Sequence, residues 1–417
     1  MEHPARLTTV RPTPESGGFT VWKKLAHHLL GPISYAWVVS RVRRDGALAF
    51  PSDPPISHGS GPAPDRVLVL GGLIVRGLGV ASYDLSLSGH LARQLAARTG
   101  RGADVETRGI DKFDTFLADD ALRSENLARF DVVLLMLGIS EVISMRPIAA
   151  YRSDIRNLLA TIAEVSPDAQ PVLIAGVAPF MQGMDVPGFV ADWMERRIIQ
   201  QNAETQRACE ETGAAQYVPF APERAGIRYG RDASVVYDSW AQALVPVLDR
   251  ALAVSAPALA PPPDESARQR ALDELGVDSS PDAAVDRIVE MARDMLGVDS
   301  ASLNLIDRDR QWTKAAAGLD ARDVPRDDAV CNTTIQTPGV YVVEDMDADP
   351  AYAHSSWREA QGHVRFYAGY PLEAPGGERV GALCVMDRSP RHFTRSETAM
   401  LRDLALRAQA VLWEKAS

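Results

Sequence analysis

Residues 66–100 read RVLVLGGLIVRGLGVASYDLSLSGHLARQLAARTG, and their pattern is the clearest indication of how the first half of the chain folds. The stretch opens with a short apolar run ending in glycine, which is typical of a buried parallel strand. Leucines then recur at helical spacing at Leu87, Leu91 and Leu95, and Gly100 follows as a helix stop. This order of strand, loop and helix predicts the first unit of an α/β domain.

The alternation of strand and helix continues to residue 252. The further predicted strands are 130–138, 170–180 and 215–220, and the predicted helices are 154–169, 191–214 and 235–252. Strands joined through helices imply right-handed crossovers, so we predict a doubly wound parallel sheet of the flavodoxin-like kind. In such sheets, sites form at the carboxyl ends of the strands.

The last third of the chain has a different pattern, in which helices flank strands joined as hairpins. An amphipathic helix precedes two alternating segments that are close enough in sequence to form a hairpin, and a closing helix has Ser396 as its predicted N-cap. The predicted helices are 282–297 and 396–415, and the predicted strands are 300–307, 311–318, 340–346, 365–374 and 379–387. This order predicts an α+β domain with an antiparallel sheet.

Two stretches rich in proline divide the chain. Residues Phe50–Arg66 contain Pro, Gly and Ser throughout, and we expect an extended connector without a regular element. Residues Ala253–Ser266 form a Pro/Ala linker, which is semi-rigid because polyproline backbones are stiff. The predicted divisions are 1–66 (a helix and connector), 67–252 (the α/β domain), 253–268 (the linker) and 269–417 (the α+β domain).

Composition limits the partners and the compartment. The 417 residues include 44 Lys and Arg against 55 Asp and Glu, so the net charge is -11 and we expect no nucleic-acid partner. Three cysteines are too few for a disulfide framework, and no segment reaches the length of a membrane-spanning helix. We therefore expect a cytoplasmic protein without a bound metal or cofactor.

The N-terminal region differs in charge from the rest. Residues 1–66 hold eight Lys and Arg against five Asp and Glu, and residues 20–44 combine tryptophans with several of these bases. This segment is a candidate for weak contact with an anionic membrane surface. The alternative, which we favour because the basic residues are few, is a helix packed on the following domain.

The α/β half resembles the SGNH (GDSL-type) esterases, on the segments 67–100, 131–142 and 238–252. The resemblance implies ester hydrolysis by a serine nucleophile, yet the place of the Gly-Asp-Ser motif reads Gly71-Gly72-Leu73. Leu73 has no hydroxyl and cannot attack a carbonyl. The third motif, usually Gly-x-Asn-Asp, reads Gly-Ile-Ser140-Glu141, and Glu141 would place negative charge near a developing anion.

The last motif of the family, Asp-x-x-His, is also replaced. Alignment on the following helix puts Arg228 and Arg231 there, and an arginine stays protonated and cannot act as a base. Two guanidinium groups would suit a carboxylate or phosphate ligand, with pairing to nearby acids as the favoured alternative. No histidine lies between residues 91 and 353, and we interpret His90 as a helix-face residue rather than a relocated base.

The α/β domain is therefore predicted to be inactive as a serine esterase. The alternative is a hydrolase with a rearranged site, because several hydroxyls remain near the strand ends. These hydroxyls belong to Ser82, Ser86, Ser88 and Ser140.

The C-terminal half resembles GAF domains, the small-molecule sensing modules of bacterial signalling proteins, on segments that cover 300–335, 340–352, 364–387 and 391–405. The resemblance implies an antiparallel sheet with a ligand pocket on one face and terminal helices that pair, in some cases as a homodimer. Met291, Met295, Leu404, Leu406 and Leu412 could form such a helix contact. The pocket candidates implied are Trp312, Cys331, Asp345, Arg365 and Tyr367.

Cys331 permits two interpretations. A redox or chromophore role requires a lowered thiol pKa or a nearby cation, and the related Cys-x-His pattern here reads Cys331-Asn332-Thr333. A buried structural cysteine is the alternative that we favour, and Cys384, in an apolar strand, is expected to be core.

Together these features predict a non-enzymatic regulatory protein. We expect the GAF domain to bind a small ligand or partner, with the pseudo-hydrolase domain as scaffold or second binding module. The alternative is a GAF-regulated ester hydrolase. No kinase, cyclase, phosphodiesterase or DNA-binding signature is seen, so a signal would pass through contact with another protein.

Overall fold

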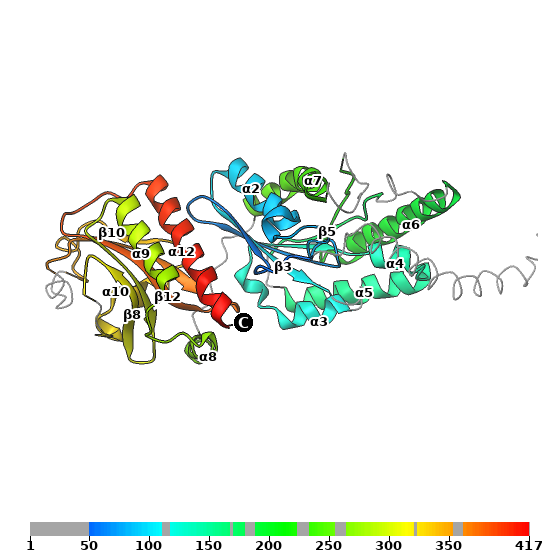
Figure 1. Cartoon of the computed structure of the whole chain (residues 1–417). Coiled ribbons are helices and arrows are strands. Elements are labelled where there is room, and N and C mark those ends of the chain that lie inside the picture. The colour runs from blue at the N-terminus through cyan, green and yellow to red at the C-terminus, as the bar shows by residue number, and fades with distance from the viewer. Residues whose placement is uncertain are drawn as a thin grey trace, which may run out of the picture.

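The computed structural model of the protein describes residues 50–110, 117–166, 170–179, 188–222, 233–254, 264–320, 323–352 and 362–416. The described residues form two domains that lie side by side (Figure 1), each built on one six-stranded sheet. The segment 20–44, with its proposed membrane contact, lies outside the described residues. Within the described ranges, no helix is both long and apolar enough to cross a bilayer.

The first sheet has the strand order β1-β3-β2-β4-β5-β6. Its strands pair in parallel except at the edge, where β1 runs antiparallel to β3. The predicted doubly wound, mainly parallel sheet is confirmed. The strands are β1 (Ile56–Gly59), β2 (Asp65–Gly71), β3 (Ala103–Gly109), β4 (Val132–Met136), β5 (Val172–Ala175) and β6 (Gln216–Val218).

Helices cover both faces of this sheet. Helices α2 and α7 pack on one face, over a core that includes Val67, Leu91 and Trp240. Helices α3, α5 and α6 cover the other face, over Leu68 and Leu158. The helices are α2 (Leu87–Thr99), α3 (Leu117–Ser124), α4 (Ile139–Ile143), α5 (Ile148–Val165), α6 (Gly188–Thr212) and α7 (Ala233–Val254).

Two strands of this sheet were not expected from the sequence. The connector Phe50–Arg66 was predicted to lack regular structure, and this is wrong, because Ile56–Gly59 forms edge strand β1. The prolines of the connector precede or follow these four residues, so the backbone of β1 is free to pair with β3. Strand β3 was not predicted because Asp104, Glu106 and Arg108 alternate along it and make one of its two faces polar, so the segment lacks an apolar run.

The second sheet is antiparallel throughout, as predicted, with the order β10-β11-β12-β7-β8-β9. The predicted hairpin of 300–307 with 311–318 is confirmed. The strands are β7 (Ser300–Ile306), β8 (Arg310–Ala317), β9 (Val324–Pro325), β10 (Tyr341–Val343), β11 (Phe366–Glu373) and β12 (Arg379–Asp387).

Three helices cover one face of this sheet, and the short α10 (Val330–Thr334) lies on the other. The three are α8 (Glu265–Leu275), α9 (Ala283–Leu296) and α12 (Arg395–Ala416). The predicted cap of α12 is wrong by two residues. Thr394 and Glu397 form a reciprocal capping box, in which the Glu397 side chain accepts from the Thr394 N–H at 2.8 Å. On α9, Met291 and Met295 are exposed.

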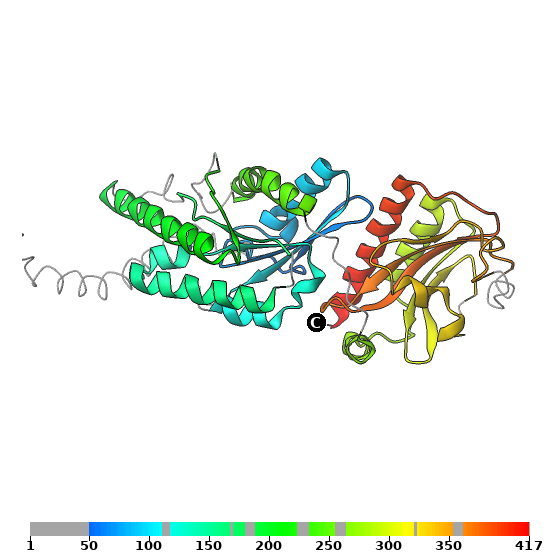
Figure 2. The same cartoon turned by 180° about the vertical axis from the view of Figure 1, so that it is seen from behind.

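The two domains meet where α12 contacts the end of β1 and the start of β3, and Figures 1 and 2 show α12 on the side of its domain that faces the first sheet. Arg402, in the first half of α12, donates to the Gly59 carbonyl at 2.9 Å and pairs with Asp104. Arg66 pairs with Glu373 at 2.6 Å, and Arg129 donates to the Gly376 carbonyl at 2.8 Å. The polar face of β3 is therefore the surface on which the C-terminal domain docks.

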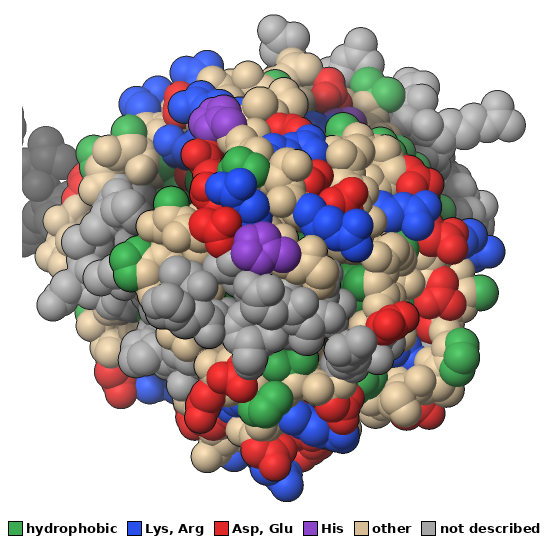
Figure 3. All heavy atoms as spheres, turned by 90° about the vertical axis from the view of Figure 1, so that its left-hand side faces the viewer, with side chains coloured by type: hydrophobic (Ala, Val, Ile, Leu, Met, Phe, Trp, Pro, Cys, Tyr) green, Lys and Arg blue, Asp and Glu red, His purple; other side chains and the backbone are tan. Residues whose placement is uncertain are grey.

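The far end of the C-terminal domain carries mixed charge. Figure 3 shows acidic and basic side chains interspersed over this end. The described side chains visible there form no broad basic surface of the kind that binds a nucleic-acid backbone.

Candidate functional site

The strand ends of the α/β domain carry little of the chemistry expected of an esterase. Strand β2 ends at Gly71, and a Cβ there would lie 2.4 Å from the Met136 carbonyl oxygen, so only glycine fits between β2 and β4. Leu73 follows and packs on a hydrophobic cluster that closes this corner. The cluster contains Leu78, Val142, Ile143, Val177, Met194 and Ile198.

Ser140 is the hydroxyl beside this corner. It lies in the first turn of α4, and its Oγ is 3.9 Å from where a Cβ on Gly72 would stand. Gly138, at φ 102°, ends the preceding loop in the left-handed region and so permits the turn. Glu141 is buried at 2% exposure next to Ser140. Arg228 and Arg231 lie outside the described residues.

A second group of residues forms a serine–histidine–aspartate chain on the flank of the same domain. His90 Nε2 lies 2.9 Å from Ser234 Oγ, and His90 Nδ1 lies 3.1 Å from Asp238 Oδ1. Ser234 and Asp238 are one helical turn apart on α7, and His90 faces them from α2. These are the contacts by which an imidazole takes a proton from a hydroxyl while an acid orients it.

The surroundings of His90 favour its neutral form. Burial, and then the positive charge of Arg93, lower the pKa of His90, and Asp238 opposes them. Asp238 also accepts hydrogen bonds from Gln94 and Gln242, each at 2.8 Å. Ser234 and Asp238 were not predicted as site residues, although their spacing of four residues on a helix places them on one face.

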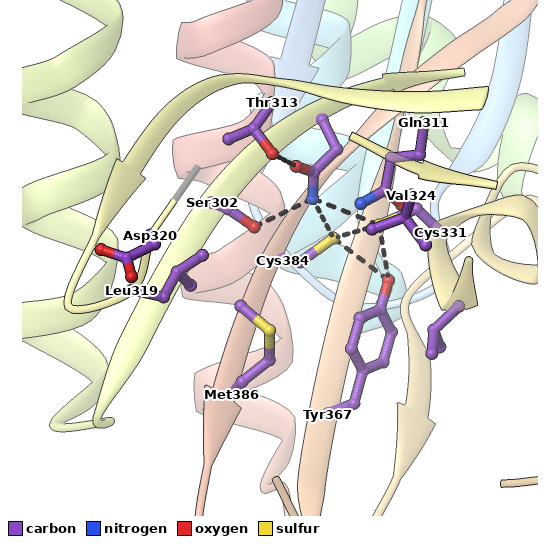
Figure 4. Close-up of a pocket in the computed structure, with 12 residues that line it drawn as sticks. Ser302, Gln311, Thr313, Leu319, Asp320, Val324, Cys331, Tyr367, Cys384 and Met386 are labelled. Carbon is purple, nitrogen blue, oxygen red and sulfur yellow. Dashed lines mark hydrogen bonds between the residues drawn. The ribbon is translucent and has the colours of Figure 1, made fainter. Parts of the chain in front are cut away.

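The GAF half contains a polar cavity between its sheet and α10 (Figure 4). Its volume of about 20 Å3 suits one water-sized molecule. Alternate residues of four strands line it, because side chains two apart share a face. They are Ser302 and Asn304 on β7, Gln311 and Thr313 on β8, Tyr367 on β11, and Cys384 and Met386 on β12.

Two thiols and a phenol meet at the centre of the cavity. The Cys331 and Cys384 sulfurs are 3.0 Å apart, and Tyr367 Oη lies 3.4 Å from the first and 3.1 Å from the second. Figure 4 shows these three side chains pointing toward one another. Asn304 Nδ2 donates to Cys331 Sγ at 3.4 Å, and Tyr367 Oη also contacts Thr334 Oγ1 at 2.6 Å.

The five pocket residues implied by the GAF resemblance lie at three different places in the structure. Cys331 and Tyr367 line the cavity together. Trp312 faces the opposite side of the sheet, where it lines a groove of about 460 Å3 beside α8. Arg365 makes a two-point ion pair with Asp345, at 3.1 and 2.6 Å, away from the cavity. Cys384 is fully buried in a hydrophobic cluster, as expected of a core residue, and its sulfur faces Cys331.

These two folds, a doubly wound sheet and an antiparallel sheet with a pocket, define a hydrolase-like domain joined to a sensor-type domain. Residues 69–244 match the GDSL-like Lipase/Acylhydrolase family, and residues 280–412 match the GAF domain family. The chain thus combines a GDSL-like domain with a C-terminal GAF domain, as the resemblances implied.

Individual relatives match parts of the chain. A cyclic di-GMP phosphodiesterase from Pseudomonas aeruginosa is 36% identical over 146 residues, which are 34% of this chain and 25% of that protein. The chain therefore matches a quarter of the length of this curated relative.

Solved structures with similar folds include members of both classes. An acetyl-xylooligosaccharide esterase from Geobacillus is 17% identical, with a TM-score of 0.33, over 46% of this chain and 95% of that one. A GAF domain of an Acinetobacter phosphoenolpyruvate-protein phosphotransferase is 18% identical, with a TM-score of 0.27, over 35% of this chain and 90% of that one.

Proposed function

We propose that the protein is a signalling component whose GAF domain binds a small molecule beside Cys331 and Tyr367, in a cavity that holds one water-sized molecule as it stands and must widen to admit a larger ligand. The observation that carries the proposal is Gln311. Its side chain is buried and faces the cavity, and its Oε1 has no hydrogen-bond partner. An unpaired buried acceptor is costly, so a ligand that donates a hydrogen bond there gains from satisfying it.

Similarity supports the signalling role. The GAF match and the identity to a protein named as a cyclic di-GMP phosphodiesterase both point toward signal transduction. The α/β domain would then act as a scaffold, since Leu73 packs into a hydrophobic cluster where the GDSL family carries its nucleophile. The contacts of α12 with Gly59 and Asp104 connect the two domains directly, so a change in the GAF domain could be transmitted to the α/β domain through them.

Native mass spectrometry of the full-length protein, as purified from cells, tests ligand binding. We expect a bound small molecule that is released on denaturation. Gln311→Leu should lose it while keeping its thermal stability, because the variant removes an unpaired acceptor at similar volume. The control Gln336→Leu, at an exposed glutamine outside the cavity, should keep it. The proposal fails when wild-type protein carries no such molecule, or when Gln311→Leu retains it.

One observation favours a second function. The Ser234–His90–Asp238 chain has the contacts that an ester hydrolase requires, and Ser234 lies in the first turn of α7, where backbone N–H groups have no partner within the helix itself and point toward the helix start. The enzyme proposed from this arrangement is a GAF-regulated ester hydrolase with a rearranged site.

A fluorophosphonate probe decides between these two functions. Labelling that is stoichiometric in wild-type protein and lost in Ser234→Ala supports the hydrolase. Ser140→Ala is the matched control, because Ser140 is a hydroxyl of the same domain beside the strand ends. Absence of labelling on folded wild-type protein supports the scaffold role.

A further inference from the structure

The two cysteines of the GAF cavity are placed for reaction with each other. Cys331 lies on α10 and Cys384 on β12, 53 residues apart in sequence, yet their sulfurs are 3.0 Å apart. A disulfide needs about 2 Å between the sulfurs. A side-chain shift of about one ångström would therefore join them without rearranging the sheet.

Polar neighbours distinguish the two sulfurs chemically. Burial disfavours a thiolate at Cys331, but hydrogen bonds from Cys384, Tyr367 and Asn304 outweigh it and hold the pKa of Cys331 below its usual value. Burial, together with the nearby Cys331 sulfur, raises the pKa of Cys384 well above its usual value. Cys331 is thus the nucleophile of the pair, and Cys384 is the thiol that keeps its proton.

A small oxidant can reach this pair from solvent. The cavity holds space for a water-sized molecule beside the sulfurs, and it is also lined by Asp320, an exposed residue. Tyr367 Oη lies within 3.4 Å of both sulfurs, where it can pass a proton to a leaving oxygen.

We propose that Cys331 and Cys384 are a redox-active pair that reacts with peroxides to form an intramolecular disulfide. This goes beyond ligand binding, because it assigns a chemical reaction to the two sulfurs themselves. In the first step, the Cys331 sulfur attacks the peroxide. An S–O bond forms, the O–O bond breaks, and the leaving oxygen takes the thiol proton as water or an alcohol.

In the second step, Cys384 attacks the sulfenic sulfur of Cys331. The S–S bond forms, the S–O bond breaks, and hydroxide leaves with the Cys384 proton as water. The two thiols lose two electrons in all, and the O–O bond of the peroxide accepts them. A thiol reductant reverses the reaction by thiol–disulfide exchange.

The third cysteine is an internal control. Cys209 is buried on α6 in the other domain, and burial raises its pKa to about 11. We expect Cys209 to remain a thiol at peroxide concentrations that oxidise the pair.

The test uses full-length reduced protein and hydrogen peroxide. After treatment, the chain is denatured, its free thiols are alkylated, and peptides are mapped by mass spectrometry. Three alkylated cysteines before treatment should become one, at Cys209, with a peptide crosslink between Cys331 and Cys384 that dithiothreitol removes. Three alkylated cysteines in folded, peroxide-treated wild-type protein would overturn the proposal, as would a crosslink through Cys209.

Two variants test the order of the steps. In Cys384→Ser, Cys331 should accumulate as a sulfenic acid that dimedone traps, because the second thiol is missing. In Cys331→Ser, Cys384 should give no dimedone adduct. An adduct on Cys384 at the rate seen for Cys331 would contradict the assigned nucleophile, and wild-type mapping decides the pairing even where a variant is unstable.

Discussion

The guanidinium of Arg402, on α12 of the GAF domain, is paired with the carboxylate of Asp104, on β3 of the GDSL-like domain. Their side chains are only 1% and 9% exposed. Burial disfavours the charge on Asp104, but Arg402 and then His58 beside it hold the pKa of Asp104 well below its usual range. The two domains are therefore joined by a buried ion pair, and loss of Arg402 leaves the buried Asp104 carboxylate without its main counter-charge.

Arg402→Met should weaken docking of the two domains. It leaves Asp104 as a buried carboxylate without its main counter-charge, which typically costs about 3–5 kcal/mol. We expect a lower denaturation midpoint, a larger radius of gyration by small-angle X-ray scattering, and cleavage at the interdomain linker by added protease.

The matched control is Arg98→Met, whose partner Asp249 lies at an exposed site within one domain. It should shift the midpoint by about 1 kcal/mol or less. The double variant Arg402→Met with Asp104→Asn should recover part of the loss, because both charges of the pair are removed together. An Arg402→Met protein as compact and stable as wild type would show that the domains dock by other contacts.

His90 should make stability depend on pH. Its pKa is lowered from 6.5 by burial, so the unfolded chain binds a proton more readily than the folded one. The stabilisation is fully present above pH 6.5 and is lost as the pH falls toward the lowered folded-state pKa. Urea midpoints between pH 5 and pH 8 should rise with pH in wild type and rise less in His90→Gln.

His392→Gln is the control for that experiment, because His392 is highly exposed, at 81%. It should keep the pH slope of wild type. A slope that is unchanged in His90→Gln would mean that other groups carry the pH dependence.

The sequence predicted what depends on local pattern and missed what depends on contact between segments far apart in the chain. The buried strand β2 and helix α2 could be predicted from an apolar run and from the spacing of the leucines. Gly100 marks the end of α2, because its φ of 68° lies in the left-handed region that favours a residue without a Cβ. Strand β3 has no such pattern. Its Asp104 pairs with Arg402, and its Glu106 pairs with Arg129. Neither arginine is close to β3 in sequence, so the local pattern does not indicate these ion pairs.

The candidate sites show the same division. Cys331 and Tyr367 could be placed in a pocket by resemblance, because each stands at a position that the GAF family uses. The approach of Cys384 to Cys331 depends on β12 pairing with β7 in a register that sets Cys384 opposite Ser302. The Ser234–His90–Asp238 chain likewise requires α2 and α7 to pack side by side, which a single helix pattern does not reveal.

Tyr367→Phe should destabilise the GAF domain. The variant removes the hydroxyl that contacts Thr334 Oγ1 at 2.6 Å and both sulfurs, so Thr334 Oγ1 keeps only its longer contact with the Val330 carbonyl, at 3.4 Å, and each sulfur loses one polar contact. The cost should be about 1–3 kcal/mol, measured by urea denaturation. The control Tyr341→Phe loses one half-buried contact, to Tyr352, and should cost less.

Glu265 should report on how α8 is held to the GAF domain. Hydrogen bonds from Arg268 and Arg326 lower the pKa of Glu265 to about 2, against an ordinary value of 4.5. The stabilisation is thus present above pH 4.5 and is lost as the pH falls toward 2. In Arg326→Ala, the Glu265 pKa measured by NMR titration should move back toward 4.5, and the acid-side loss of stability should shrink. The control Arg308→Ala, which removes an exposed guanidinium near Asp273 on the same helix, should leave the Glu265 pKa where it is. A Glu265 pKa unaffected by Arg326→Ala would mean that Arg268 alone holds this carboxylate, and that α8 does not depend on the contact with Arg326.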